Sequence, residues 1–193
     1  GREEWPVVTL KDDDEVVGAV ALDDGTEELC FITSDAQLLH FGADAVRPQG
    51  RSGGGIAGVK LAAGARVVFF GALPASGDRE VVTVSGSSTA LPGTEAGAAK
   101  VTPFSEYPAK GRATGGVRCH RFKAGEDVLL TAWAGPAPAR AAAASGVPVD
   151  LPPADGRRDG SGVPLSQPVD ALAGPVSARA LAAGVSPTGP VES

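Results

Sequence analysis

The sequence predicts an all-β chain built as an array of propeller-like blades, and two observations lead to this fold class. First, an Arg is followed four residues later by a Gly and then a branched aliphatic residue at three places, Arg51–Ile56, Arg112–Val117 and Arg158–Val163, so successive copies start 61 and 46 residues apart. Such periods are typical of propeller blades, in which each unit is a small sheet that cannot bury its faces alone. Second, the chain holds 27 Gly and 16 Pro, and no window keeps a long 3.6-residue apolar period.

The register of the repeat extends beyond the turns. Five and eleven residues after the aliphatic position, the first two copies carry apolar residues again: Leu61 and Phe122, then Val67 and Val128. The same register run backwards reaches Trp5, Leu10 and Val16. We therefore expect the chain to open inside a further, truncated copy, and the absence of Met favours a piece of a larger protein.

The expected units follow from this register. The end of a truncated blade is expected over 1–13, and two blades over 14–65 and 66–126. A degenerate last blade is expected over 127–168, and a flexible tail over 169–193. The chain would thus hold about three blades of a larger disc. Alternation and turn residues predict strands over 16–22, 29–33, 37–41, 56–61, 66–73, 80–85, 117–122 and 127–133. The stretch 86–100 is expected to be an exposed loop, and the tail is almost only Ala, Gly, Val, Pro and Ser.

The charge is unevenly distributed. The chain has a net charge of −6, but residues 51–123 hold 4 acidic and 10 basic side chains, a net charge of +6 between acidic flanks. Lys60 and Arg121 occupy the same place in two successive copies, so repetition predicts a stripe of positive charge along a rim. Such a stripe favours a polyanionic partner.

Other classes of site have little support in the sequence. Cys30 and Cys119 lie in apolar segments of different repeats and are expected to be reduced and structural. His40 and His120 are expected at the edge of the core or on a rim rather than as metal ligands. There is no charged-then-apolar leader and no run of eighteen apolar residues, so a cytoplasmic protein without a membrane partner is expected. No nucleophile, base and orienting group can be assembled, so this chain alone is not expected to catalyse.

Four stretches carry a family resemblance: 31–39, 46–61, 102–121 and, more weakly, 157–162. Together, over residues 5–168, the chain resembles the C-terminal domain of the A subunit of bacterial type IIA DNA topoisomerases, the group of DNA gyrase and topoisomerase IV. The resemblance implies a β-pinwheel, a disc whose four-stranded blades exchange a strand, that binds and bends duplex DNA along its basic outer rim. It also implies a location on the nucleoid, and an A-subunit dimer whose catalytic core carries the reactive Tyr and Mg²⁺. ATP would bind to a B subunit. Both the core and the B subunit lie outside this chain, so no cofactor is expected in it.

The residues expected to bind DNA are the basic side chains of the central block and of the three turns. They are Arg51, Lys60, Arg66, Lys100, Lys110, Arg112, Arg118, Arg121, Lys123 and Arg158. Each turn Arg either binds phosphate or donates to carbonyls of its own turn, and both readings stay open. Gly55, Gly116 and Gly162 are expected to be structural turn residues, and Tyr107 a packing residue.

Two features depart from the family pattern. The gyrase box Gln-Arg-Arg-Gly-Gly-Lys-Gly has only a partial counterpart in Gln49–Gly55, which favours a topoisomerase IV-like paralogue. The first repeat carries four consecutive acids over 12–15, which either face away from the duplex or are solvated turn carboxylates. The alternative function is therefore a propeller-like protein-interaction module that uses this acidic repeat.

Overall fold

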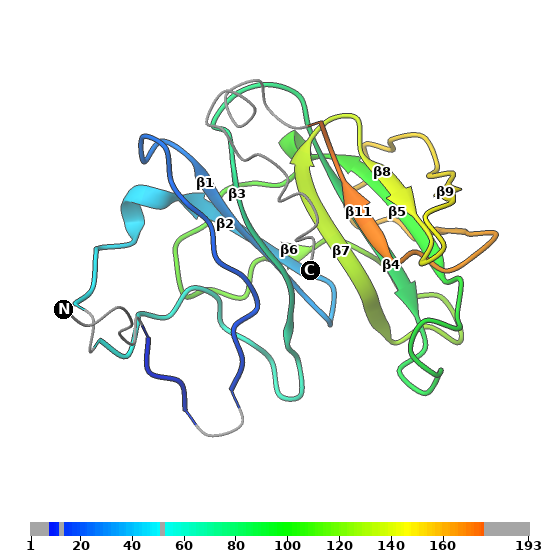
Figure 1. Ribbon diagram of the computed structural model, residues 1–193, viewed down its shortest axis with the longest axis horizontal. Coiled ribbons are helices and arrows are strands. Elements are labelled where there is room, and N and C mark those ends of the chain that lie inside the picture. Colours follow the sequence, from blue (N-terminus) through cyan, green and yellow to red (C-terminus); the bar gives the residue numbers. More distant parts are fainter. Residues whose placement is uncertain (1–7, 12–13, 51–52, 176–193) are drawn as a thin grey trace, which may run out of the picture.

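The computed structural model describes residues 8–11, 14–50 and 53–175, and this part of the chain is all-β (Figure 1). Its helices are two three-residue 3-10 turns, η1 (Ala43–Ala45) and η2 (Phe104–Glu106). Among the described residues no helix is long and apolar enough to cross a membrane. The predicted fold class is confirmed.

The strands form three antiparallel sheets that lie side by side (Figure 1). The first has the order β3-β1-β2-β6, with β1 (Glu28–Thr33), β2 (Gln37–Gly42), β3 (Val67–Leu73) and β6 (Val117–Arg118). The second has the order β10-β5-β4-β7, with β4 (Arg79–Gly86), β5 (Ala98–Pro103), β7 (Val128–Pro136) and β10 (Val163–Pro164). The third has the order β11-β8-β9, with β8 (Arg140–Ala142), β9 (Pro148–Val149) and β11 (Ala171–Ala173).

Each of the first two sheets receives a strand from further along the chain. β6 follows the second Arg-turn-Gly copy and pairs with β2, with Val117 opposite Leu38. β10 follows the third copy and pairs in the same way with β5, with Val163 opposite Ala99. Predicted units 14–65 and 66–126 therefore share the first sheet, which is the strand exchange that the resemblance implied.

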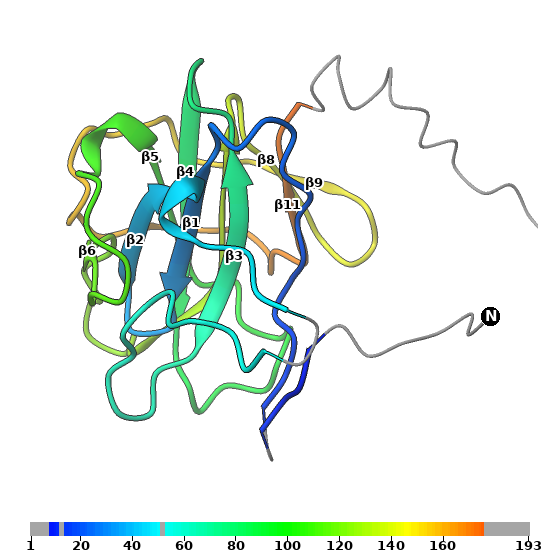
Figure 2. The same ribbon diagram turned by 90° about the vertical axis from the view of Figure 1, so that its left-hand side faces the viewer.

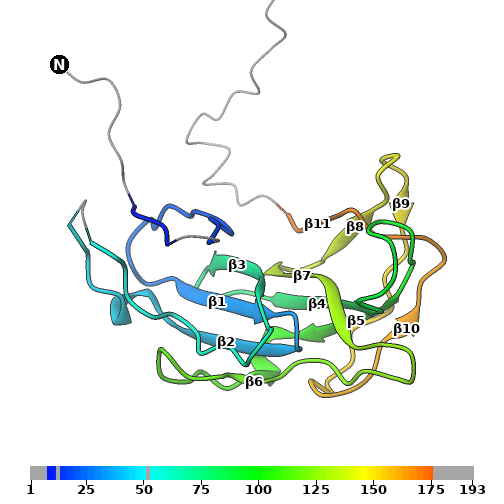
Figure 3. The same cartoon turned by 90° about the horizontal axis from the view of Figure 1, so that it is seen from below.

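The received strands lie on the outer edges of the sheets. β3 packs against β7, and β7 against β11, so the sheets converge along this side. β6 and β10 are at the opposite edges of their sheets, as the view from below shows (Figure 3). Across the first sheet the order β6, β2, β1, β3 can be followed in Figure 2. The residues after each Arg-turn-Gly motif are thereby brought to the outer edge.

Two predicted strands, 16–22 and 56–61, are absent from the described structure, and strand exchange gives the reason. The later copies of 56–61 are β6 and β10, and each pairs with a strand of the preceding copy. The described residues contain no strand of a preceding copy with which residues 56–61 could pair. Residues 14–22 instead run as exposed coil, with Gly18 near the ring of Phe70.

Three boundaries also differ from prediction. The expected loop 86–100 ends early because β5 begins at Ala98 and pairs with β4. The expected strand 117–122 stops after Arg118. β11 lies beyond the expected end of the last blade at residue 168, because it pairs with β8.

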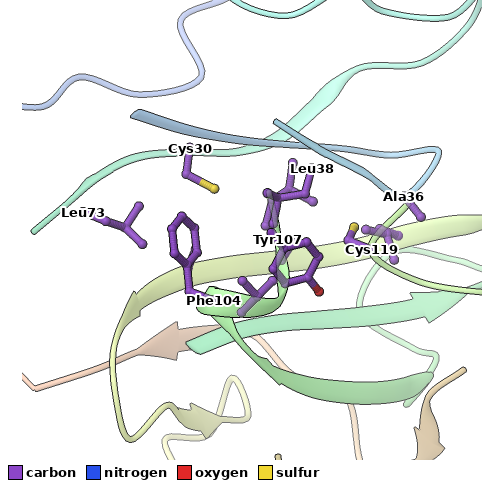
Figure 4. Close-up of a cluster of buried hydrophobic side chains, with 12 residues drawn as sticks. Cys30, Ala36, Leu38, Leu73, Phe104, Tyr107 and Cys119 are labelled. Atoms are coloured by element: carbon purple, nitrogen blue, oxygen red, sulfur yellow. The ribbon is translucent and has the colours of Figure 1, made fainter. Parts of the chain in front are cut away.

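The main core lies between the first and second sheets (Figure 4). It includes Cys30, Leu38, Phe104, Tyr107 and Cys119, each at most 3% exposed. Tyr107 is therefore a packing residue, as predicted. Both cysteines are free thiols, and burial raises the pKa of Cys119 to about 12. They act here as small apolar side chains.

A polar network around His40 also joins these two sheets. The imidazole Nδ1 of His40 contacts the carboxylate of Glu28, and Nε2 lies 2.9 Å from the carbonyl of Tyr107. Glu28 also accepts from Arg79 at 3.3 Å, and the Arg79 guanidinium stacks 4.5 Å from the centre of the Phe104 ring. Since the ring nitrogens of His40 both face acceptors, this histidine is a structural link, as its predicted position implied.

His120 links the second sheet to the third turn. Its Nδ1 lies 2.8 Å from the hydroxyl of Thr83, and the amide of Gly162 donates to Nε2 at 3.2 Å. Nε2 must therefore be unprotonated, and burial is the main reason that the pKa of His120 falls to about 4. Cys119 is buried as well, because residues 119–120 pass between two sheets. The simple alternation expected for 117–122 fails at this point.

Gly116 and Gly162 lie where the turn meets the receiving sheet. A Cβ on Gly116 would lie 2.3 Å from the carbonyl oxygen of Leu38, and one on Gly162 would lie 2.7 Å from the carbonyl of Ala98. Gly116 also has a φ of +77°. At Gly55 φ is +74° but nothing lies within 4 Å. Glycine is therefore required at the positions where a strand from the next copy comes into contact with the sheet that it joins.

Replacing Gly116 with Ala should destabilise the fold by about 2 kcal/mol or more, because it combines a disfavoured φ with a backbone clash. The matched control is Gly111→Ala, since a Cβ there meets nothing within 4 Å. Urea unfolding of both variants measures the difference. Equal midpoints would contradict the assigned role of Gly116.

Protonation of His120 should destabilise the fold at acid pH. The unfolded chain takes up this proton near pH 6.5 and the folded chain only near pH 4. The stabilisation is therefore complete above pH 6.5 and is lost as the pH falls towards 4, by up to about 3 kcal/mol. Urea unfolding across this range should show a shallower pH dependence for His120→Gln than for the wild type, and parallel curves would refute the assignment.

Candidate nucleic-acid interface

The second turn is fastened to the residues that follow the first. Arg112 Nη1 donates to the carbonyl of Ala57 at 2.6 Å, and the amide of Ala113 donates to Gly58 at 2.6 Å. The amide of Lys60 donates in return to Thr114 at 3.0 Å. Residues 57–60 therefore lie along 112–114, which brings two exposed cations, Lys60 and Arg112, into one neighbourhood.

The third turn repeats this arrangement one copy later. The amide of Arg121 donates to the carbonyl of Gly160 at 3.0 Å, which is the counterpart of the Lys60–Thr114 bond in the repeat register. Lys123 Nζ donates to the carbonyl of Gly162 at 2.6 Å. The exposed Arg121 also lies 3.8 Å from Asp159, a loose surface pair. Lys60 and Arg121 thus occupy equivalent places, as the sequence predicted.

Two further predicted cations are exposed close to these turns. Arg118 belongs to β6, the outer strand of the first sheet, and stands opposite Gln37. Lys110 precedes the second turn, and its amide donates to the carbonyl of His40 at 3.1 Å. We call the combined set the outer-edge basic surface; it consists of Lys60, Lys110, Arg112, Arg118, Arg121 and Lys123, with Arg158 half-buried at its end.

Arg66 and Arg51 do not join this set. Arg66 precedes β3, at the opposite edge of the first sheet from β6, and its backbone exchanges hydrogen bonds with Ser34 at 2.8 and 3.1 Å. Three strand spacings separate these edges, about 14 Å. Arg66 therefore lies on the side where the sheets converge. Arg51 lies outside the described residues.

The prediction that Lys100 contacts DNA is wrong, because the side chain of Lys100 is buried. Lys100 is only 4% exposed. Its Nζ donates to the hydroxyl of Thr102 at 2.6 Å and to the carbonyl of Arg158 at 2.7 Å. Burial lowers the pKa of Lys100 to about 8, so the ammonium is still the major form at neutral pH. A side chain engaged in this way cannot reach a phosphate outside.

The two readings of the turn Arg can be compared in the second turn. Arg112 does pin a backbone carbonyl, but it is that of Ala57 in the segment after the first turn and not one of its own turn, and the Arg112 side chain remains exposed. Because a guanidinium has five N–H donors, this bond leaves donors for another acceptor. Pinning and anion binding are therefore compatible at Arg112.

Sequence reasoning left out one exposed cation at the third turn, Arg157. Its side chain is 80% exposed and bonds to Asp155 at 3.0 Å, and this bond holds the pKa of Asp155 below its usual value. Of these two neighbours, Arg158 alone fits the repeat register. An Asp two residues before Arg157 is the signal that this charge is partly neutralised.

The acidic residues of the first repeat are used locally where the structure describes them. The carboxylate of Asp24 accepts from the amide of Thr26 at 3.0 Å, and that of Glu27 accepts from the amide of Asp23 at 2.5 Å. These two side chains are turn carboxylates, but the two readings concern residues 12–15, and both readings stay open there. Asp14 and Glu15 are exposed, and residues 12–13 lie outside the described ranges.

No metal centre is found in the part of the chain that the structure describes. There, no three His, Cys, Asp or Glu side chains are grouped so that they could hold a metal ion. What the described surface offers is exposed cations on glycine-rich turns.

Comparison with solved structures supports the fold. The chain is similar to the C-terminal domain of DNA topoisomerase IV, with a TM-score of 0.66 and 22% identity, over 86% of this chain and 51% of that one. It is also similar to the Escherichia coli ParC C-terminal domain, with a TM-score of 0.63 and 16% identity, over 86% of this chain and 67% of that one. At these identities the likeness concerns the fold alone.

Curated relatives match the sequence more closely over a shorter span. The DNA gyrase A protein of Salmonella typhimurium is 36% identical over 110 residues, which is 57% of this chain and 11% of that protein. The topoisomerase protein TopoM of Mycolicibacterium smegmatis is 38% identical over 106 residues, 54% of this chain and 13% of that protein. The matched part of this chain thus spans only about a tenth of these relatives.

The family comparison covers more than half of the chain. The model of the DNA gyrase C-terminal domain, a β-propeller, matches residues 6–23, 27–74 and 93–132. These segments include β1, β2, β3, β5 and β6 and the second Arg-turn-Gly motif. The chain therefore belongs to the DNA gyrase C-terminal domain family, the C-terminal β-propeller of type IIA topoisomerase A subunits.

Proposed function

We propose that this chain binds and bends duplex DNA through its outer-edge basic surface. The observation that carries the proposal is the repetition of one cation-bearing arrangement on two successive sheets: the Lys60–Thr114 bond beside Arg112, and the Arg121–Gly160 bond beside Arg158. Cations repeated at equivalent places suit a repeating backbone of phosphates. Family membership supports the same partner.

Binding is proposed to read shape rather than base sequence. The surface is made of Lys and Arg on turns and at a sheet edge, which suits phosphate contacts. It has no helix to enter a major groove, since the described helices are two 3-10 turns. The placement of β6 and β10 at the outer edges of two successive sheets suits a bent duplex that follows these edges, with specificity arising from DNA deformability.

The wider setting is proposed by extension from the family. This chain would present DNA to a catalytic core of the A subunit, which carries the reactive Tyr and Mg²⁺, as part of an A-subunit dimer. ATP would bind to the B subunit. The complex would act on DNA topology in the cytoplasm, on the nucleoid. None of the residues described here is assigned a catalytic step.

A second candidate, a protein-interaction module, is favoured by one observation. An apolar groove lies beside the acidic first repeat, lined among others by Glu15, Val17, Phe31 and Phe70. Val16 and Val17 are 61% and 48% exposed at this place. A peptide with apolar side chains would fit there, with Glu15 and Arg112 as the charged residues of the lining, and this candidate predicts no affinity for DNA.

A duplex titration over a salt series separates the two candidates. If about four phosphates are neutralised, the logarithm of the affinity should fall with the logarithm of salt concentration at a slope of about −3.6. A gel shift or fluorescence anisotropy assay measures this slope. A response that is flat in salt, or an absence of binding at low salt, would leave only the interaction module.

Reversing Arg112, Arg118 and Arg121 to Glu should abolish binding at moderate salt, because attraction becomes repulsion at the centre of the surface. A charge-matched control reverses Lys11, Arg47 and Arg140, which are exposed outside this surface. The control should retain measurable binding at the same salt concentration. If both triple variants lose affinity equally, net charge and not this surface determines binding.

We also propose that the domain is topoisomerase IV-like, because the segment 49–55 matches only part of the gyrase box. The expected behaviour is bending of DNA without wrapping of a full superhelical turn. A nicked plasmid sealed by ligase in the presence of the domain should keep the linking number of the protein-free control. A dose-dependent change in linking number would instead indicate gyrase-like wrapping.

A further inference from the structure

The third turn is held from beneath by a buried cation. The Nζ of Lys100 lies 2.7 Å from the carbonyl oxygen of Arg158 and 3.4 Å from that of Arg157. Below the turn the same ammonium reaches the hydroxyl of Thr102 at 2.6 Å, and the hydroxyl of Tyr107 lies 3.5 Å away. Lys100 therefore connects the turn to β5 and to the main core.

Other contacts fix the same segment on the second sheet. The amide of Asp155 donates to the carbonyl of Val101 at 2.9 Å, and that of Gly160 donates to Arg157 at 3.0 Å. The backbone of Gly160 also packs over the Lys100 stem, since a Cβ there would lie 3.8 Å from Lys100 Cδ. Residues 155–162 therefore form a cover over Lys100. The carbonyls of Arg157 and Arg158, on the inner side of this cover, accept from the Lys100 ammonium.

The second turn is held differently. There the turn's own Arg112 donates to the carbonyl of Ala57. At the third turn no acceptor is found for the guanidinium of Arg158 among the described residues. Val117 pairs with Leu38 in the first sheet, and the equivalent Val163 pairs with Ala99 in the second. The next residue after Leu38 is Leu39, which is therefore the equivalent of Lys100 in the first sheet. The buried cation is therefore particular to the third turn.

We propose that Lys100 positions the third turn for phosphate binding by holding its carbonyls from beneath, which leaves the guanidinium of Arg158 available to DNA. This proposal rests on the proposed DNA-binding function. Lys100 acts through the turn and touches no ligand itself. An ammonium bonded to backbone carbonyls is a charge-assisted contact, which is stronger than a neutral one.

The first test reads the turn without DNA. In Lys100→Met the turn carbonyls lose their cation, so amides bonded within the cover should exchange hydrogen about tenfold faster or more. The amides to follow are those of Asp155, Arg157, Gly160 and Gly162. The amides of Ala113 and Cys119 should keep their rates. Lys11→Met, which removes an exposed charge, is the control, and unchanged exchange in the cover would overturn the proposal.

The second test is a double-mutant cycle on duplex affinity. Lys100→Met should weaken binding by about as much as Arg158→Ala, roughly three- to tenfold, and the double variant should be no weaker than either single one. Lys100→Met combined with Arg112→Ala should instead be additive, because Arg112 lies on another turn. Additivity between Lys100→Met and Arg158→Ala would overturn the positioning role.

A second variant separates a folding defect from the loss of the Lys100 contacts, and the exchange measurement separates the role of Lys100 from DNA binding. Should Lys100→Met fail to fold, Thr102→Val removes one partner of Nζ with little change in volume and should give the same pattern at smaller amplitude. If the wild-type chain binds no duplex at low salt, the proposed function fails together with the phosphate role of Arg158. The exchange measurement then still decides whether Lys100 holds the turn.

Discussion

The pairing of a strand with the sheet before it is the interaction on which the rest of the structure depends. β6 bonds to β2 and β10 to β5, so that neither of the first two sheets is complete without residues from further along the chain. The close approach of Gly116 to the carbonyl of Leu38 makes this pairing possible. Since an unpaired strand edge leaves backbone donors and acceptors exposed, the exchange both closes one sheet and ties it to the next.

The same exchange determines where positive charge appears. Because the received strand joins the outer edge, the residues just before and after it are carried there as well. Lys60 and Arg121 reach equivalent points through equivalent backbone bonds, to Thr114 and Gly160. The basic block of the sequence thereby becomes a surface on successive sheets. Arg66 belongs to the same block but directly precedes β3, the strand at the converging edge.

Buried polar groups hold the third turn, which carries Arg158. His120 accepts the amide of Gly162, and Lys100 donates to the carbonyl of Arg158. Each connects a surface turn to the second sheet, and each would be costly to bury without its partner. The third turn is therefore anchored to its sheet by these contacts, which favours a turn arranged before any ligand arrives.

Much of the fold could be predicted because the repeat is written in local patterns. The register placed Val67 and Val128 at equivalent positions, and these residues begin β3 and β7. Alternation located β1, β2 and β4 within a few residues. The strands 16–22 and 56–61 were wrongly predicted for one reason: apolar alternation indicates that a segment can pair, and says nothing about whether a partner strand lies beside it.

For the candidate site, the sequence by itself determined which residues are basic, that they recur at fixed places, and that they gather between residues 51 and 123. Only the tertiary structure decided which of them face outward. It buried Lys100 beneath the third turn and set Arg66 on the converging side. The physical reason is that exposure depends on strand order and on contacts between distant segments, such as Lys100 with Arg158, and neither is encoded in the local pattern of a repeat.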